Sequence, residues 1–284
     1  MAATASATPR NGPGETPSAR FRQRAAAIQP LAQTRAAEVD DAESKLWGAL
    51  RFAALELVLW ASLYGLYLAV RGLSIASADE ALGNARALVD LERALGVLHE
   101  ARLQEVLGAF DGALSVYYLL GFAPLLAGVL TWLALRHRGV YRELRSLLLI
   151  SIALAVVVHL ALPVAPPRLV PELGIADSVG LDRDGSSFAG IPYNPYAAMP
   201  SMHVGWSLLL GLFAFQAAGS LIVRAFFAAH PAVMAVAVTV TGNHYFLDSL
   251  AGAAIALTAL GLWRWIPATR SWLTDHPQPA CAHR

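Results

Sequence analysis

The chain has 284 residues, of which 56% are hydrophobic and only 14% carry a charge. A soluble domain usually has about 25% charged residues, so this composition indicates a membrane protein. The net charge of +1 offers no electrostatic basis for binding nucleic acid. The single cysteine excludes a disulfide within the chain.

The N-terminal segment has no apolar run. Residues 1–30 are rich in Ala, Thr, Pro, Gly and Arg, which is typical of a disordered segment, and they lack the apolar core of a signal peptide. We therefore predict a polar cytoplasmic segment over residues 1–48, a membrane domain over residues 49–268 and a cytoplasmic tail over residues 269–284.

Six segments are long and apolar enough to cross a bilayer, which takes about 20 residues. They run approximately over residues 50–70, 112–135, 146–162, 201–219, 223–241 and 247–266. The predicted fold is therefore all-α, a polytopic bundle of six transmembrane helices. Pro231 interrupts the fifth segment, where it either occupies a first turn or kinks the helix.

Residues 81–108, between the first two predicted spans, show a helical pattern. Leu88, Leu91, Leu95 and Leu98 recur at intervals of three and four residues, with charged residues between them. This spacing predicts an outer amphipathic helix that lies on the membrane surface or packs over the bundle. The alternative is an ordinary soluble cap.

The distribution of basic residues predicts the orientation. Six spans put both termini on one side, together with the basic link at residues 136–145, and most of the 21 basic residues fall there. The positive-inside rule makes that side cytoplasmic. We therefore expect a multi-pass protein of the cell inner membrane, with the polar motifs described next on its outer face.

His244 and Asp248 stand four residues apart at the start of the sixth predicted span. On a helix this spacing puts both side chains on one face, so Asp248 can accept a hydrogen bond from one ring nitrogen of His244. That bond fixes the tautomer and presents the other nitrogen as a nucleophile. The alternative is a structural hydrogen bond, because a carboxylate at the edge of a membrane helix needs a partner.

A second motif, Pro-Ser-Met-His at residues 200–203, begins the fourth predicted span. Ser201 is a favourable N-cap, and Pro200 blocks backward extension of the helix. The free N–H groups of the first turn can bind an anionic oxygen, and His203 can donate a proton to a leaving group. Alone this motif is compatible with a plain helix start, but both motifs on one face favour a catalytic site.

Arg168 follows the third predicted span, at the end of the proline-rich segment 163–168. The prolines stiffen the chain and limit where the arginine can point. A guanidinium stays charged and suits two phosphate oxygens at once, so Arg168 is a candidate phosphate ligand. The alternative is a surface arginine that binds lipid headgroups.

The order of these motifs resembles the type 2 phosphatidic acid phosphatase superfamily over roughly residues 50–266: an arginine after span three, Pro-Ser-x-His at span four and His-x-x-x-Asp at span six. Segments 193–205 and 241–248 are most similar to the branch of inositol phosphorylceramide synthases, which are inositolphosphotransferases. The resemblance implies a six-helix membrane bundle and catalysis through a phosphohistidine, without a metal or another cofactor.

Site roles follow from the resemblance by position. It implies that His244 is the nucleophile, Asp248 its orienting partner and His203 the general acid. It also implies that Ser201 and Arg168 contact the phosphate.

The chain departs from the common phosphatase pattern at two cationic positions. Ala161 stands where that pattern has a lysine, and Val238 where it has an arginine. Met202 replaces a usual glycine. Three polar residues are candidates to replace the missing phosphate ligands: Arg183, Asn194 and Asn243. Of these, we include Asn243 among the predicted phosphate ligands.

Two further features are weaker candidates. His159 lies near the outer end of the third predicted span and can approach the site, although a buried, hydrogen-bonded histidine is the alternative. Asp177, Asp182 and Asp184 resemble part of a calcium loop. The other ligands of such a loop are missing, so we predict no metal there.

The sequence therefore predicts a membrane enzyme that transfers the phosphoryl group of a lipid phosphate to water or to an alcohol. An inositol or sugar hydroxyl is the favoured acceptor, because of the branch resemblance. The alternative is a non-catalytic membrane protein that binds lipid headgroups with a degenerate site. In that case the ring nitrogens of His203 and His244 need not lie within about 10 Å of each other.

Overall fold

The computed structural model describes residues 41–65 except 42, 45 and 64, together with residues 77–180, 187–188, 191–192 and 196–265. This part of the chain is all-α, with one additional pair of two-residue strands. The chain divides into two units, residues 1–69 and 70–284. Most of the predicted N-terminal segment and the whole predicted tail lie outside the described residues.

The described residues of the first unit form one apolar helix. Residues Leu46–Leu63 are long and apolar enough to cross a membrane, with a mean hydropathy of 1.4. This helix corresponds to the first predicted span, 50–70, whose last residues lie outside the described part of the chain.

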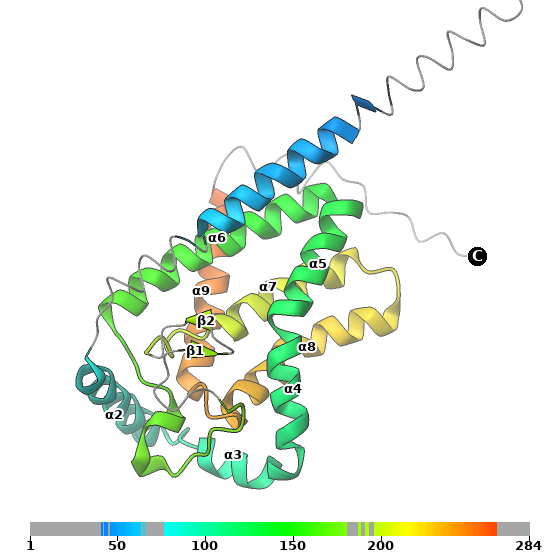
Figure 1. The fold of residues 1–284 in the computed structure, drawn as a ribbon. Coiled ribbons are helices and arrows are strands. Elements are labelled where there is room, and N and C mark those ends of the chain that lie inside the picture. The colour runs from blue at the N-terminus through cyan, green and yellow to red at the C-terminus, as the bar shows by residue number, and fades with distance from the viewer. Residues whose placement is uncertain are drawn as a thin grey trace, which may run out of the picture. The chain divides into compact units, whose positions relative to one another are not determined.

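The second unit is a bundle of helices, with α2, α3 and the connection after α6 gathered at one end (Figure 1). Its α-helices are α2 (Ala78–Leu95), α3 (Glu100–Leu107), α4 (Asp111–Gly121), α5 (Ala123–Arg136), α6 (Arg138–Ala161), α7 (Met202–Ala217), α8 (Leu221–Val240) and α9 (Phe246–Trp265). Short 3₁₀ turns and strands complete it: η1 (Gly108–Phe110), η2 (Pro167–Leu169), η3 (Pro171–Leu173), β1 (Ser187–Phe188) and β2 (Ile191–Pro192).

Five helical segments of the described chain are long and apolar enough to cross a membrane, which makes it a multi-pass integral membrane protein. In the second unit they are Glu100–Arg136, which contains α3, α4 and α5, and the helices α6, α8 and α9. The remaining predicted span is α7, an apolar helix of only 16 residues. At 1.5 Å per residue it extends about 24 Å, less than a hydrocarbon core of about 30 Å. The predicted count of six spans is therefore not confirmed.

Local sequence signals set the helix boundaries around the site. The hydroxyl of Ser77 caps α2, and Gly96 ends that helix with a φ of 71°. Ser201 caps α7, as its position predicts, and its hydroxyl accepts a hydrogen bond from the N–H of Val204. Pro231 lies inside α8, so the first-turn alternative was wrong.

Helices α7 and α9 approach each other closely at their N-termini. A Cβ on Gly252 would lie 2.0 Å from the carbonyl oxygen of Ser201, and a Cβ on Gly205 would lie 2.6 Å from the carbonyl oxygen of Gly252. The N–H of Ser201 donates to the carbonyl of Asp248 at 2.9 Å. Two glycines therefore let the starts of both helices meet.

Helix α2 is the predicted amphipathic helix, but a different face of it is buried. The segment 81–108 forms two helices, α2 and α3, rather than one. Leu88 is buried, whereas Leu91 and Leu95 are 50% and 58% exposed. The buried face of α2 consists of Ala81, Ala85, Leu88, Val89 and Glu92.

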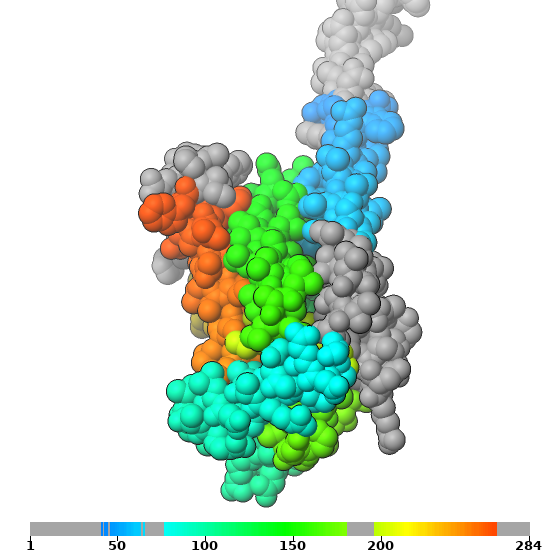
Figure 2. Space-filling view, turned by 90° about the vertical axis from the view of Figure 1, so that its left-hand side faces the viewer, coloured from blue at the N-terminus to red at the C-terminus, as the bar shows by residue number. Residues whose placement is uncertain are grey.

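This buried face of α2 packs against loops at the end of the bundle. The apolar partners on the other side come from the α6–α7 and α8–α9 connections and are Val164, Ala165, Val170, Ala198 and Tyr245. Figure 2 shows α2 and α3, in cyan and blue-green, lying across this end of the second unit. Helix α2 therefore covers the loops that precede α7 and α9.

Substitution of Gly252 by alanine tests the contact between α7 and α9. Such a change inside a helix usually stabilises by about 0.5–1 kcal/mol. Here we expect the opposite sign, a destabilisation of about 1–3 kcal/mol, because the new Cβ would overlap the backbone of Ser201. Thermal unfolding in detergent measures the change.

Gly261→Ala on the same helix is the matched control. No atom lies within 4 Å of the Cβ that this substitution adds, so it should be neutral or stabilising. If Gly252→Ala and Gly261→Ala gave the same unfolding midpoint, the close packing of α7 on α9 would be contradicted.

Candidate active site

The connection between α8 and α9 turns back over the end of α8. The N–H groups of Asn243 and His244 both donate to the carbonyl of Val238, at 3.0 and 3.1 Å. Gly242 has a φ of 71°, and a Cβ there would lie 2.9 Å from the carbonyl oxygen of Ala176. Glycine is therefore required in this turn, both for its backbone angle and for space. The turn places His244 shortly before the first residue of α9.

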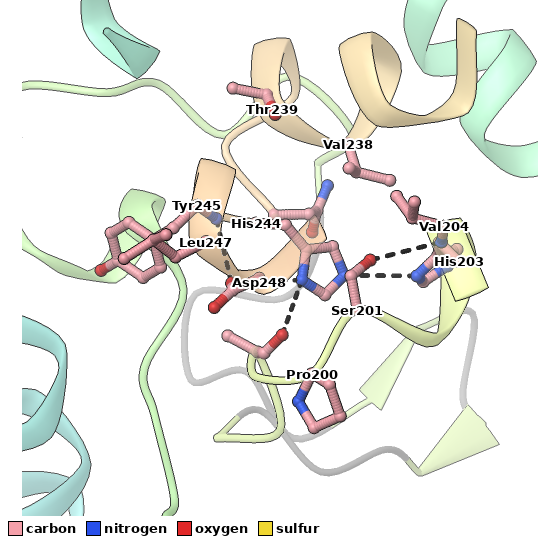
Figure 3. A network of polar contacts seen from close by, with 12 residues as sticks. Pro200, Ser201, His203, Val204, Val238, Thr239, His244, Tyr245, Leu247 and Asp248 are labelled. Carbon is pink, nitrogen blue, oxygen red and sulfur yellow. Dashed lines mark hydrogen bonds and ion pairs between the residues drawn. The ribbon is translucent and has the colours of Figure 1, made fainter. Parts of the chain in front are cut away.

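His244 is buried at the start of α9, with Asp248 beside it (Figure 3). Its Nδ1 lies 2.8 Å from the carbonyl oxygen of Ala198 and 3.4 Å from Oδ2 of Asp248. A carbonyl oxygen only accepts hydrogen bonds, so Nδ1 carries the proton and Nε2 the lone pair. The predicted contact with Asp248 is present, but the Ala198 carbonyl is the nearer partner.

Nε2 of His244 faces His203 (Figure 3). The distance from this nitrogen to Nδ1 of His203 is 3.3 Å, and the two ring centroids are 5.4 Å apart. Because Nε2 of His244 is the acceptor, Nδ1 of His203 is the donor. The rings of Tyr118 and Phe122 also lie against His203, with centroids 4.7 and 4.1 Å from its own. The two predicted motifs therefore meet directly.

Asp248 and Ser201 join the two helix starts. Asp248 is fully buried, and its Oδ2 accepts a hydrogen bond from the N–H of Tyr245 at 2.9 Å as well as lying near His244. Ser201 is equally buried, and its N–H donates to the Asp248 carbonyl. The carboxylate therefore ties the imidazole to the first turn of α9.

Arg168 lies in η2 and reaches the same loop. Its N–H donates to the carbonyl of Gly242 at 3.1 Å, and its Nη1 donates to Oδ1 of Asn243. Its Nε lies 3.8 Å from Oδ2 of Asp177, and its side chain is only 5% exposed. Asn243 in turn donates to the hydroxyl of Thr241 at 2.8 Å. The guanidinium is therefore held by the turn that carries His244.

The surroundings of His244 keep its ring neutral. Burial lowers the pKa of His244 to about 4, and the positive charge of Arg168 acts in the same direction. The hydrogen bond to the Ala198 carbonyl favours the charged ring and opposes both. Near neutral pH the imidazole is therefore uncharged, with the lone pair of Nε2 available for nucleophilic attack.

Two other histidines differ in their relation to the site. His159, at the end of α6, lies with its Nε2 3.3 Å from the carbonyl oxygen of Pro200, so it supports the segment that precedes α7. His230 lies within α8, where its Nδ1 is 2.6 Å from the hydroxyl of Tyr117. Arg183 and Asn194 lie outside the described residues.

Comparison with protein families matches residues 86–262 to the PAP2 superfamily. This range is more than half of the chain and contains the whole constellation around His244. The chain belongs to the PAP2 superfamily. Comparisons with curated proteins and with solved structures gave no match.

Membership of the PAP2 superfamily indicates phosphatase-type phosphoryl transfer on a phosphate-bearing substrate. Among the residues that the structure describes, no group of three or more His, Cys, Asp or Glu side chains is arranged to hold a metal ion. Catalysis without a metal stays a prediction, as does the location of the site on the outer face of the membrane.

Two buried glutamates near the PAP2 site were not predicted. Glu92 of α2 accepts a hydrogen bond from the N–H of Leu247 at 2.7 Å, and Glu100 of α3 accepts one from the N–H of Phe246 at 3.0 Å. The sequence held a signal for the first of them. Glu92 follows Leu88 by four residues, so it lies on the apolar face of α2, where an acid is unexpected.

NMR of the PAP2 protein with ¹⁵N-labelled histidine tests the low pKa of His244. We expect this ring to stay neutral, with the proton on Nδ1, between about pH 8 and about pH 5, whereas an unfolded histidine titrates near 6.5. Burial and the charge of Arg168 are the cause. The ¹⁵N shifts report both charge and tautomer.

Loss of the signal in His244→Gln assigns it. The same protein unfolded in denaturant supplies the reference titration. A His244 ring that is already charged at about pH 6, or that carries its proton on Nε2 when neutral, would contradict this electrostatic account.

Proposed function

We propose that the chain is an integral-membrane phosphotransferase or phosphatase for lipid phosphates that works through a phosphohistidine at His244. The observation that carries the proposal is the 3.3 Å contact between Nε2 of His244 and Nδ1 of His203. A lone pair and an N–H group face each other across this contact. In-line displacement at phosphorus needs a nucleophile and a proton donor on opposite sides of the phosphoryl group.

The first half-reaction exchanges a P–O bond for a P–N bond. Nε2 of His244 attacks phosphorus, and the leaving oxygen departs on the far side with the Nδ1 proton of His203, which enters this step as an imidazolium and leaves it as a neutral ring. Reacting atoms start about 3–3.5 Å apart. The two ring nitrogens are themselves only 3.3 Å apart, which leaves no space for a phosphoryl group between them. His203 therefore has to move away before this group can bind.

The Nδ1 side of His244 stabilises the charge that forms. When Nε2 binds phosphorus, the imidazole becomes cationic. The Ala198 carbonyl and the Asp248 carboxylate both lie at Nδ1 and accept its hydrogen bond. These acceptors are in place before the reaction, which is the arrangement that lowers a barrier most effectively.

Arg168 is the proposed ligand of the non-bridging phosphate oxygens, since a guanidinium binds two of them at once. Asn243 holds this guanidinium, so its role is to orient Arg168 as well as to face the phosphate. Ser201 and the N–H groups of the first turn of α7 supply neutral donors. Ala161 and Val238 leave this cradle with fewer cations than the common phosphatase pattern.

The second half-reaction decides between hydrolysis and transfer. An oxygen of water or of an alcohol attacks phosphorus, His203 takes its proton, and the P–N bond breaks to restore His244. The similarity of segments 193–205 and 241–248 to inositolphosphotransferases favours transfer to an inositol or sugar hydroxyl. The positive-inside rule favours a site at the outer face of the inner membrane.

A non-catalytic protein that binds lipid headgroups is the alternative, motivated by the missing cations at Ala161 and Val238. The geometry favours the enzyme. Nucleophile and acid must reach the same phosphoryl group, and the nitrogens of His203 and His244 are 3.3 Å apart. A decayed site has no reason to keep this contact or the buried Arg168 beside it.

Alanine substitutions of the two histidines test the proposed function. Purified His244→Ala and His203→Ala proteins should each lose about 10²–10⁴-fold in kcat on a panel of lipid phosphates and phosphoinositides, assayed with and without inositol. His137→Ala, in the link between α5 and α6, is the control and should keep wild-type activity. Turnover by His244→Ala at the wild-type rate would rule out the phosphohistidine.

Substitution of Arg168 by lysine tests the phosphate cradle. A lysine keeps the charge but cannot bind two oxygens at once or keep the bond to Asn243. We expect kcat/KM to fall by about 10–100-fold, the cost of losing one charged hydrogen bond. Arg102→Lys on the exposed face of α3 is the control. Equal kcat/KM values for both variants would remove Arg168 from the cradle.

A further inference from the structure

Three carboxyl groups converge on the first turn of α9, directly after His244. The successive N–H groups of residues 245–247 donate to Oδ2 of Asp248, Oε1 of Glu100 and Oε1 of Glu92, at 2.9, 3.0 and 2.7 Å. The three acids are 0%, 2% and 0% exposed. Glu92 belongs to α2 and Glu100 to α3, so hydrogen bonds connect the start of α9 to two helices from a much earlier part of the sequence.

Burying three adjacent negative charges is very costly, so the cluster has to hold fewer than three. Glu92 and Glu100 accept from the N–H groups of adjacent residues, so their carboxyl groups lie side by side, close enough for one to bond to the other. A bond between two carboxyl groups requires a proton on one of them, because a carboxylate only accepts. The Oε2 atoms of both are buried, and neither receives a hydrogen bond from a donor in the described residues. One shared proton gives both of these oxygens a partner.

We propose that Glu92 and Glu100 form a carboxyl pair that shares one proton at neutral pH and positions the start of α9, and with it His244, for catalysis. The catalytic part of this inference rests on the function proposed above, whereas the shared proton does not. Neither glutamate touches the reacting atoms, so both are positioning residues.

The electrostatic surroundings agree with a proton on the pair. Burial, the interaction with the Glu100 side chain and the charges of Glu100 and Asp248 together raise the pKa of Glu92 to about 9, and the bond from the N–H of Leu247 opposes them. Among the described residues, Tyr245 also faces the pair. Burial and these carboxyl groups raise the pKa of Tyr245, so it stays neutral.

The sign of the pH dependence follows. Folding raises the pKa of Glu92 above its ordinary value of 4.5. Protonation of Glu92 therefore stabilises the folded state fully below about pH 4.5, and this stabilisation is lost as the pH rises towards about 9. Above that pH two neighbouring carboxylates and Asp248 repel one another at the start of α9. We expect His244 to lose its alignment there, while Arg168, which is held by Gly242 and Asn243 ahead of His244, still binds phosphate.

The first experiment measures kcat and KM against pH for three kinds of variant. Glu92→Gln keeps an acceptor for the N–H of Leu247 and donates to Glu100 in place of the shared proton. Glu92→Leu keeps the volume but does neither. Asp90→Asn on α2 and Glu105→Gln on α3 are matched controls, because both acids are exposed and pair with arginines.

We expect wild-type kcat to fall as the pH rises through about 9, with little change in KM, and this fall to persist in both controls. In Glu92→Gln the fall should disappear, and kcat at neutral pH should stay within about tenfold of wild type. Glu92→Leu should lose about 10²-fold in kcat at all pH values. A Glu92→Gln profile identical to that of wild type would overturn the positioning role.

The second experiment detects the proton itself and needs no activity. Infrared spectra of the full-length protein with ¹³C-labelled glutamate separate a protonated glutamic acid from aspartic acids. We expect a carboxylic acid band of glutamate at neutral pH that vanishes near pH 9, is absent from Glu92→Gln and persists in Asp90→Asn.

An identical band in wild type and Glu92→Gln would overturn the shared proton, whatever the kinetics show. If the wild-type protein turned over none of the lipid phosphates, the proposed function would fail instead, and the infrared band would still decide whether the pair holds a proton.

Discussion

The hydrogen bond from Nδ1 of His244 to the carbonyl of Ala198 is the interaction on which the site depends. It forces the neutral tautomer in which Nε2 holds the lone pair, and it aims that lone pair at His203. Asp248 lies beside the same nitrogen and can share the positive charge that the ring would acquire in the proposed reaction. Without this backbone acceptor the two histidines could exchange the roles of donor and acceptor, and the direction of proton transfer would not be defined.

The fold supplies this geometry through close helix contacts rather than through many charges. Gly252 admits the backbone of Ser201, so the starts of α7 and α9 meet, and each brings one histidine. Arg168 is fixed by the same turn that carries His244. Because water is largely excluded here, each fixed dipole and charge acts more strongly than it would in solution. In the described part of the chain, the proposed cradle of one arginine and neutral donors is therefore a workable alternative to one with several cations.

Much of the site could be predicted from the sequence because it depends on local spacing. The helical interval between His244 and Asp248 and the capping position of Ser201 both have the geometry expected of them. The role of the Ala198 carbonyl could not be foreseen, since every residue has such a group and only the tertiary fold selects one. The buried glutamates were missed because acids in a helix are expected to face water. The face of α2 was misjudged for a similar reason: small alanines, not the leucine stripe, allow the close contact with the loops.

Detection of the covalent intermediate tests the central claim most directly. Protein quenched with alkali during turnover of a lipid phosphate can be digested and analysed by mass spectrometry. The account predicts a phosphoryl group on Nε2 of His244 that is lost in acid, and that is absent when His244 is replaced by glutamine. Steady turnover with no phosphoryl group on His244, or with one on a different residue, would contradict it.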